Sequence, residues 1–231
     1  MSQLSNKERV LKIAIALEEL NTKVVFVGGS VIQFYAFDQG ASNPMSTYDV
    51  DCVVDLTTYK EYHIFETEIL AKNFFNDTSE GAPICRYLFD DETVDFMPKV
   101  DTAIGKSNRW YPQGISQKIE IQLDPKTTIF IMPVTYYLAS KIEALISRGG
   151  YDYRGAKDFE DIVYVINNCP DLIKMIQDTD DEEVKDYLRS EFSKICDRPN
   201  IREEIECALT DDDRGNYVWE QMNSIINSTK P

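Results

Sequence analysis

Three aspartates in two short segments are the residues best suited to do chemistry. Asp49 and Asp51 stand two apart where a strand-like run, residues 50–54, begins, and Asp95 is the lone charge of a second run, residues 93–97. Side chains two apart on a strand project from one face, so the carboxylates of the first pair lie together. They repel each other unless a cation lies between them, and carboxylate oxygens favour Mg²⁺ or Mn²⁺.

A single metal pocket follows if the two runs are neighbouring strands of one sheet. Asp49, Asp51 and Asp95 would then converge, and two ions held in this way can activate an attacking hydroxyl and neutralise a departing pyrophosphate. The structural alternatives are a polar strand end at a turn for the first pair and a solvent-facing sheet surface for Asp95. A lone aspartate in an apolar strand is costly to bury unless it is paired or bound to metal.

A glycine turn is the second candidate feature. The β-branched run at residues 23–27 leads into Gly28, Gly29 and Ser30, and a helix is predicted over residues 30–37. Free backbone N–H groups and a helix N-terminus at one point hold phosphate, and the Ser30 hydroxyl adds a donor. A Gly-Gly turn between a strand and a helix is also common where nothing binds.

Charged residues in the second half form the third candidate feature. Lys141 and Arg148 lie seven apart on one predicted helix, and Asp158 and Asp161 lie three apart on the next. Each pair therefore shares a helix face. A salt bridge between the two helices is the structural interpretation of this pattern.

The elements that carry these residues change character once along the chain. Strands and helices alternate up to about residue 132, and helical periodicity dominates afterwards. We therefore predict an α/β (α+β) fold, with a mixed sheet and flanking helices over residues 1–132 and an all-helical domain over residues 133–231. Strands are predicted over residues 23–27, 50–54, 85–89, 93–97, 118–123 and 128–132. A first helix is predicted to begin at a capping box formed by residues 5–8, with Ile13, Leu17 and Leu20 as its apolar stripe. Further helices are predicted over residues 30–37, 59–73, 134–148, 156–167, 170–176, 182–196, 201–209 and 216–226. The strands at 85–89 and 93–97 read as a hairpin joined by residues 90–92.

Together, the glycine turn after a strand, the Asp-x-Asp pair on a second strand and the single aspartate on a later strand resemble the nucleotidyltransferase superfamily with the polymerase-β-type catalytic core. The segments at residues 141–148 (KIEALISR) and 157–162 (KDFEDI) are similar to the K-x-x-A-L…R…(R/K)-D-x-x-D-(L/I) pattern of AbiEii-like nucleotidyltransferases. Those proteins include the toxins of some bacterial toxin–antitoxin and phage-defence systems. The resemblance covers roughly residues 24–166.

The resemblance implies an Mg²⁺- or Mn²⁺-dependent enzyme that transfers a nucleoside monophosphate from an NTP to a hydroxyl. In its terms Asp49, Asp51 and Asp95 are the catalytic and metal-binding residues. The nucleotide is bound by Lys141 and by downstream aspartates, and the matching positions are Asp161 and Asp158. The resemblance implies one of three kinds of acceptor: RNA (above all a tRNA 3′ end), a protein, or a small molecule. It also implies an antitoxin protein as a partner. The alternative is a catalytically silent module that binds a nucleotide or a partner.

Composition limits the other classes of function. Lys and Arg number 24 against 40 Asp and Glu, so the net charge is −16 and non-specific binding of nucleic acid or anionic membrane is disfavoured. Residues 99–126 are locally rich in basic residues, and there Arg109 and Trp110 could contact acceptor phosphates and stack a base, with a plain surface loop as the alternative. We interpret the acidic run at residues 178–213 as a solvated outer face. It is also one place where a basic antitoxin could dock.

Histidine and cysteine usage excludes several kinds of site. His63 is the only histidine, and the five cysteines never form a C-x-x-C pair, which argues against zinc, multi-histidine and disulfide frameworks. The apolar stretches are shorter than the roughly 20 residues that span a bilayer. The N-terminus lacks the apolar core of a signal peptide. We therefore expect a cytoplasmic protein without a membrane partner.

Overall fold

The computed structural model describes most of the chain. The described residues are 4–37, 41, 44–56, 58–102, 105–149, 152–210 and 212–228. They form two compact units, of which unit 1 comprises Met1–Gln33 and Met45–Pro133, and unit 2 comprises Phe34–Pro44 and Val134–Pro231. The two units describe packing within the chain and do not test domain limits. The predicted domains, residues 1–132 and 133–231, therefore stay a prediction.

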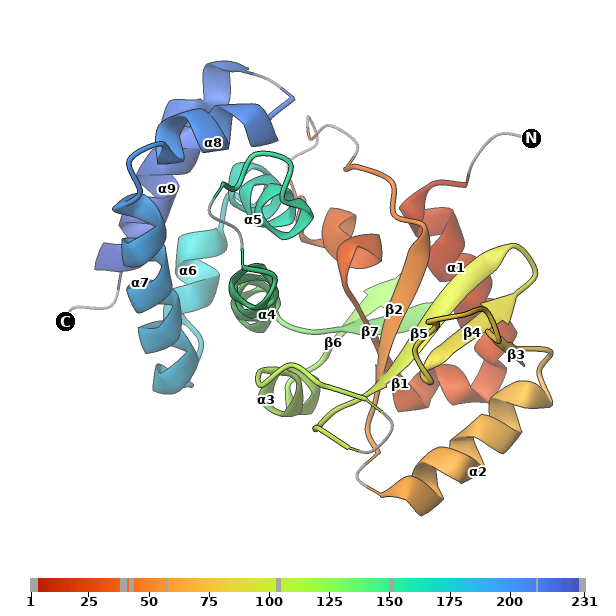
Figure 1. Cartoon of the computed structure of the whole chain (residues 1–231). Helices are drawn as coiled ribbons and strands as arrows, with labels where there is room; N and C mark the ends of the chain where they lie inside the picture. The colour runs from red at the N-terminus through yellow and green to blue at the C-terminus, as the bar shows by residue number, and fades with distance from the viewer. Residues whose placement is uncertain are drawn as a thin grey trace. The chain divides into compact units, whose positions relative to one another are not determined.

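Unit 1 is built on a mixed sheet. Its strands are β1 (Val24–Val27), β2 (Asp49–Val54), β3 (Phe75–Asn76), β4 (Arg86–Phe89), β5 (Glu92–Pro98), β6 (Ile119–Gln122) and β7 (Thr128–Ile131). They lie in the order β3-β4-β5-β2-β1-β7-β6. β2 runs parallel to β5 and β1 parallel to β7, whereas the other neighbours are antiparallel. Figure 1 shows β1, β2 and β5 in the middle of this sheet, and the predicted mixed α/β fold class is confirmed.

One face of the sheet is covered because alternate residues of its strands are apolar. The helix α2 (Tyr59–Leu70) places Phe65 against Phe96 of β5, with ring centroids 5.3 Å apart. Phe74 and Tyr87 surround the same Phe96 ring. Since neighbouring side chains on a strand point to opposite faces, this core places Asp95 on the other face.

The helices of unit 1 differ from prediction in their details. The first, α1 (Asn6–Leu17), is confirmed: it begins at the predicted capping box of Ser5 and buries its apolar face. The segment after the glycine turn is a 3-10 helix, η2 (Gly29–Tyr35), rather than an α-helix. α2 ends earlier than predicted, and Asn73 just beyond it adopts a positive φ of 65°, a conformation that does not continue a helix. The 3-10 helix η1 (Glu18–Lys23), the helix α3 (Tyr111–Ser116) and the strand β3 were not predicted.

Unit 2 is helical in its described residues, and each predicted helix there is confirmed to within about two residues at either end. They are α4 (Val134–Ser147), α5 (Lys157–Asn168), α6 (Leu172–Gln177), α7 (Glu182–Cys196), α8 (Ile201–Ala208) and α9 (Gly215–Asn227), with the short 3-10 helix η3 (Asp212–Arg214) before the last. Their apolar stripes pack together, notably α4 on α5 and α7 on α9. Among the described residues no helix has the length and apolar character needed to cross a membrane.

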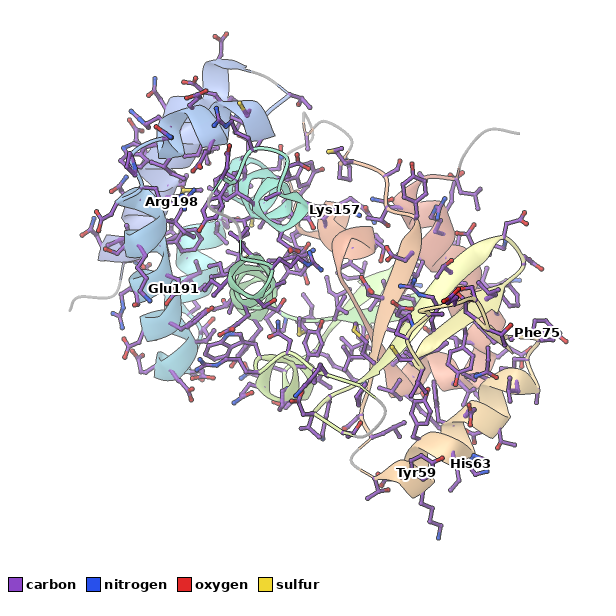
Figure 2. The ribbon with its side chains drawn as sticks, in the orientation of Figure 1. Tyr59, His63, Phe75, Lys157, Glu191 and Arg198 are labelled. Carbon is purple, nitrogen blue, oxygen red and sulfur yellow. The ribbon has the colours of Figure 1, made fainter. Side chains whose placement is uncertain are left out.

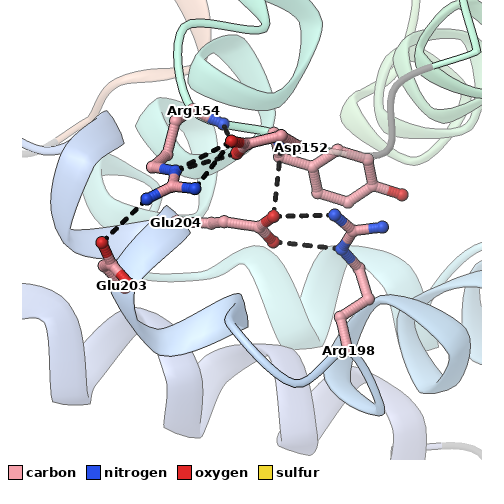
Figure 3. Close-up of polar contacts among 6 residues, drawn as sticks. Asp152, Arg154, Arg198, Glu203 and Glu204 are labelled. Carbon is pink, nitrogen blue, oxygen red and sulfur yellow. Dashed lines mark hydrogen bonds and ion pairs between the residues drawn. The ribbon is translucent and has the colours of Figure 1, made fainter.

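A buried ion pair ties the segment before α5 to α8 (Figure 3). Glu204, only 2% exposed, accepts hydrogen bonds from Arg198 at 3.0 and 2.7 Å and from the Tyr153 N–H at 3.2 Å. The Arg198 guanidinium also lies 3.7 Å from the centroid of the Tyr153 ring. Nearer the surface, Arg154 pairs with Asp152, which lowers the pKa of that carboxyl to about 2. These contacts fix the start of α5.

Candidate active site

Three aspartates meet on the face of the unit 1 sheet that is opposite the Phe96 core. β2 and β5 are parallel neighbours whose register pairs Asp49 with Thr93 and Asp51 with Asp95. One carboxylate oxygen from each aspartate lies within 4.8 Å of those of the other two. Asp95 is 8% exposed, and the other two are half-buried. The structure therefore brings together all three of the predicted metal-binding residues, which we call the carboxylate cluster.

The start of β2 is fixed by the first residue of α1. Asn6 donates from Nδ2 to the carbonyl oxygen of Met45 at 3.0 Å, and its Oδ1 accepts the Thr47 N–H at 3.0 Å. The Thr47 hydroxyl then donates to the carbonyl oxygen of Asp49 at 2.9 Å. These bonds hold the backbone just before the Asp-x-Asp pair, and so set where the two carboxylates begin.

The glycine turn lies directly against the carboxylate cluster. Gly28 has a φ of +69°, and a Cβ atom at this position would lie 2.0 Å from Oδ2 of Asp51. Both the positive φ and the close approach require glycine. The turn that the sequence singled out for phosphate binding is therefore next to the predicted metal ligands, as the proposed chemistry requires.

Ser30 and Gly29 support the phosphate interpretation less directly. Ser30 is buried, and its hydroxyl donates to the carbonyl oxygen of Val27 at 3.3 Å. Gly29 opens η2, whose seven residues are in 3-10 rather than α conformation. A short 3-10 segment has a weaker dipole than the predicted α-helix, so backbone N–H groups of the turn are the stronger part of the candidate phosphate site.

Arg86 is a member of the site that the sequence reasoning missed. It lies on β4 opposite Asp95. Its Nε donates to Oδ1 and its Nη2 donates to Oδ2 of Asp95, each at 2.8 Å. These hydrogen bonds raise the pKa of the arginine above its usual value. The carboxylate cluster therefore contains a built-in positive charge.

The hairpin register explains why Arg86 was missed. A three-residue connection at 90–92 would pair Phe89 with residue 93 and place Arg86 opposite residue 96. In the structure only residues 90 and 91 form the turn, Asp90 has a positive φ of 50°, and Phe89 pairs with Glu92. A shift of one residue in the register changes the cross-strand partner of every residue in the hairpin. A two-residue turn at Asp90 and Asp91 would have predicted the observed pairing of Arg86 with Asp95.

The donor set of the carboxylate cluster suits a hard divalent cation. Three carboxylates supply oxygen ligands, which Mg²⁺ and Mn²⁺ prefer. With the Arg86 guanidinium the formal charge is −3 + 1 = −2, which one divalent cation balances. The pKa of Cys52, which follows Asp51 on β2 and is buried, is raised by burial and further by Asp51 and Asp95. The residues present thus fit the predicted cofactor.

A second charged cluster lies in unit 2, between α4 and α5. Lys141 donates from Nζ to Asp161 Oδ2 at 2.5 Å and to Asp158 Oδ1 at 3.3 Å, and all three side chains are buried. Arg148 forms an ion pair with the same Asp158. This is the helix–helix salt bridge that the sequence allowed as the structural interpretation. A role of the three buried residues in nucleotide binding stays a prediction.

Comparison with solved structures gives the fold a name. An antigenic nucleotidyltransferase-like protein from Paracoccidioides brasiliensis matches with a TM-score of 0.50 and 16% sequence identity, over 92% of this chain and 98% of that one. The chain has a nucleotidyltransferase-like fold. A candidate nucleotidyltransferase from H. pylori matches 99% of this chain and 94% of its own, with a TM-score of 0.46 and 11% identity. No family model and no curated protein sequence matches the chain.

The basic segment beside this nucleotidyltransferase-like sheet differs from prediction. Trp110 is 1% exposed, and the Arg109 guanidinium lies 4.6 Å from the centroid of its ring. A ring buried in the protein and covered by arginine is unable to stack on a base of an acceptor. The prediction that Trp110 forms a stacking platform was therefore wrong, because this large apolar ring serves the core instead.

The single histidine lies on an exposed helix surface, whereas Cys52 and Cys85 lie close enough to Asp95 for its charge to raise the pKa of their thiols. The His63 side chain, 69% exposed on α2, projects outward together with Tyr59 (Figure 2) and contacts Glu66 at 3.3 Å. All five cysteines are free thiols, and Cys52, Cys85 and Cys169 are buried. Burial raises the pKa of the Cys85 thiol to about 11, which makes it a poor nucleophile at neutral pH.

Proposed function

We propose that this protein is a nucleotidyltransferase that moves a nucleoside monophosphate from an NTP to a hydroxyl acceptor and releases pyrophosphate. One observation carries the proposal: Asp49, Asp51 and Asp95 converge from two in-register strands on one face of a nucleotidyltransferase-like sheet. Gly28 supports it, because the turn predicted to bind phosphate lies directly against Asp51.

In this mechanism the chain's own residues hold and orient the reactants. Asp49, Asp51 and Asp95 would hold Mg²⁺ or Mn²⁺. The bound ion supplies charge neutralisation at the triphosphate and lowers the pKa of the acceptor hydroxyl. The acceptor oxygen forms a bond to the α-phosphorus while the bond to the pyrophosphate oxygen breaks, and one of the three carboxylates takes the hydroxyl proton. The turn at Gly28 and Gly29 orients the phosphates, with Ser30 as an added donor if its hydroxyl leaves Val27.

Nucleotide binding by unit 2 is part of the same proposal. Lys141 is proposed to contact the triphosphate, and Asp161 and Asp158 to position the lysine. The support is the similarity of the two segments to the AbiEii-like pattern. In the ion-paired arrangement Lys141 is held by both aspartates, so binding an NTP would exchange at least one of them for phosphate oxygen.

The acceptor and the biological role are proposed from the AbiEii-like resemblance. A tRNA 3′ end, a protein side chain and a small molecule all offer the required hydroxyl. In an AbiEii-like system the enzyme would act as a toxin, with an antitoxin protein as its partner. The net charge of −16 opposes an anionic acceptor and favours a basic partner.

A second candidate function is a catalytically silent module that binds a nucleotide or a partner protein. The observation that favours it is the Arg86–Asp95 pair, because both oxygens of the third carboxylate already accept hydrogen bonds. In a silent module this pair would be permanent and would keep Asp95 out of the metal site.

Label transfer separates the two functions. The protein is incubated with each α-labelled NTP and Mg²⁺ or Mn²⁺, with total tRNA, with a protein extract, or with neither. We expect label on one acceptor with the wild type and its loss in Asp51→Asn, whereas Glu120→Gln, an exposed acid on β6, keeps full transfer. NTP binding without transfer to any acceptor would favour the silent module. Neither NTP binding nor transfer would overturn the enzyme and the nucleotide-binding module, and would leave only a module that binds a partner protein.

A further inference from the structure

The Arg86–Asp95 pair has a geometry that a passing surface contact lacks. The antiparallel register of β4 and β5 sets the two residues opposite each other, and both nitrogens of the guanidinium edge meet both carboxylate oxygens at 2.8 Å. Bidentate pairs of this kind are stronger and more specific in geometry than single contacts. The pair is therefore built into the hairpin.

The position of the pair makes it relevant to any cation in the carboxylate cluster. Asp95 is shared: its oxygens bind Arg86, and one of them lies within 4.8 Å of the ligand oxygens of Asp49 and Asp51. The aspartate side chain is 11% exposed and the arginine side chain 30% exposed, so little water separates them. A positive charge this close repels a second one with little screening.

Charge counting decides how many cations such a site favours. Without Arg86 the three carboxylates carry −3, and two divalent cations would leave +1. With Arg86 the cluster carries −2, so one divalent cation gives neutrality and a second would leave +2 in a partly buried place. The first ion should therefore bind at Asp49 and Asp51, because both oxygens of Asp95 already accept hydrogen bonds from Arg86.

We propose that Arg86 is the counter-ion of the carboxylate cluster, which restricts the nucleotide-free protein to one divalent cation by holding Asp95 in a bidentate pair. Arg86 thus acts through Asp95 as a positioning residue. The carboxylate of Asp95 binds a second cation only when an anionic phosphate is present to balance the added charge. The inference rests on the proposed function for its biological meaning, but its metal-binding content is independent of turnover.

The test measures Mn²⁺ binding to the full chain without nucleotide, by electron paramagnetic resonance of free Mn²⁺ and by thermal unfolding with and without Mn²⁺. The wild type should bind one ion. Arg86→Gln should bind two, the first of them roughly tenfold more tightly, because a nearby positive charge is gone. Its metal-free melting temperature should fall, and Mn²⁺ should raise it by more than it raises that of the wild type.

Two variants serve as controls. Lys99→Gln removes the same charge from unit 1, at an ion pair with the exposed Asp55, and should bind one Mn²⁺ with wild-type affinity. Arg86→Lys keeps the charge but loses the bidentate geometry. It should also bind one ion. If Arg86→Gln fails to fold without metal, Mn²⁺ should restore its folding, and the bound ions are then counted on the refolded protein.

Other results would overturn the inference. Weaker Mn²⁺ binding in Arg86→Gln would mean that the arginine only orients Asp95 as a ligand. Two ions in the wild type, or no ion in any variant, would remove the proposed restriction. If the Mn²⁺ stoichiometries are as expected but the wild type transfers no label, the proposed function fails while the inference about Arg86 stands. Failure of the inference and failure of the proposed function are therefore distinguishable.

Discussion

At the scale of single residues, the candidate site leaves its members little freedom. Gly28 is confined by a positive φ and by Asp51, whereas Gly81 has a positive φ in open space and Gly105 has neither constraint. Comparison of these three glycines separates the cost of the backbone conformation from the cost of the close approach.

We expect Gly28→Ala to destabilise the protein by about 2 kcal/mol or more, since both costs apply. Gly81→Ala should cost about 1 kcal/mol, and Gly105→Ala should be close to neutral. Denaturant unfolding of the three variants measures the difference. Equal stability of Gly28→Ala and Gly105→Ala would show that the turn does not approach Asp51 as described.

The Arg86 pair reverses one expectation about Asp95. Three repelling carboxylates alone would make Asp95→Asn neutral or stabilising in the metal-free protein. Because Asp95 pairs with Arg86, we expect the substitution to cost about 1–3 kcal/mol instead. Chemical unfolding in EDTA measures this, and a stabilised Asp95→Asn would contradict the pair.

At the scale of elements, the sequence predicts type better than register. The helices of unit 2 have strong periodicity and were found, and β2 and β5 were recognised from their apolar alternation. β3 has only two residues, which are too few to give a periodic signal. α3 contains Pro112 and Gly114, whose low helix propensity argues against a helix there. Asp49 and Asp51 were predictable because they lie two apart on one strand, and Asp95 because it is the lone charge in the apolar run at residues 93–97. Arg86 depended on a one-residue difference in turn length.

The buried Glu204 makes a prediction about α8 and its pH dependence. Burial raises the pKa of Glu204, but the hydrogen bonds from Arg198 and Tyr153 outweigh it, and the net pKa is lowered from 4.5. A lowered folded-state pKa stabilises the protein above the unfolded value, and this stabilisation is lost as the pH falls through the folded value.

Glu204→Gln should therefore cost about 2–4 kcal/mol at pH 7, and progressively less as the pH falls below about 4.5. Glu203→Gln, an exposed partner of Arg154, is the matched control and should change little at any pH. Melting temperatures across this pH range measure both. A pH-independent loss in Glu204→Gln would point to packing rather than to the charge.

At the scale of the whole molecule, net charge bears on the choice of acceptor. A chain of charge −16 repels an RNA acceptor over long distances, and salt screens that repulsion. If the acceptor is tRNA, kcat/KM for tRNA should rise as KCl increases from about 50 to about 200 mM, the opposite of a basic RNA-binding protein. A steep fall with salt would instead reveal a local basic groove, and an uncharged acceptor should give a flat profile.

The central claim is that the carboxylate cluster transfers a nucleotide and not another part of the NTP. The most direct measurement follows the fate of the label from α-labelled and γ-labelled NTP in parallel, with the wild type and Asp51→Asn. Nucleotidyl transfer predicts that α-label stays on the acceptor and γ-label leaves as pyrophosphate, and that both signals vanish in the variant. Transfer of γ-label to the acceptor, or α-label transfer that survives in Asp51→Asn, would contradict the account.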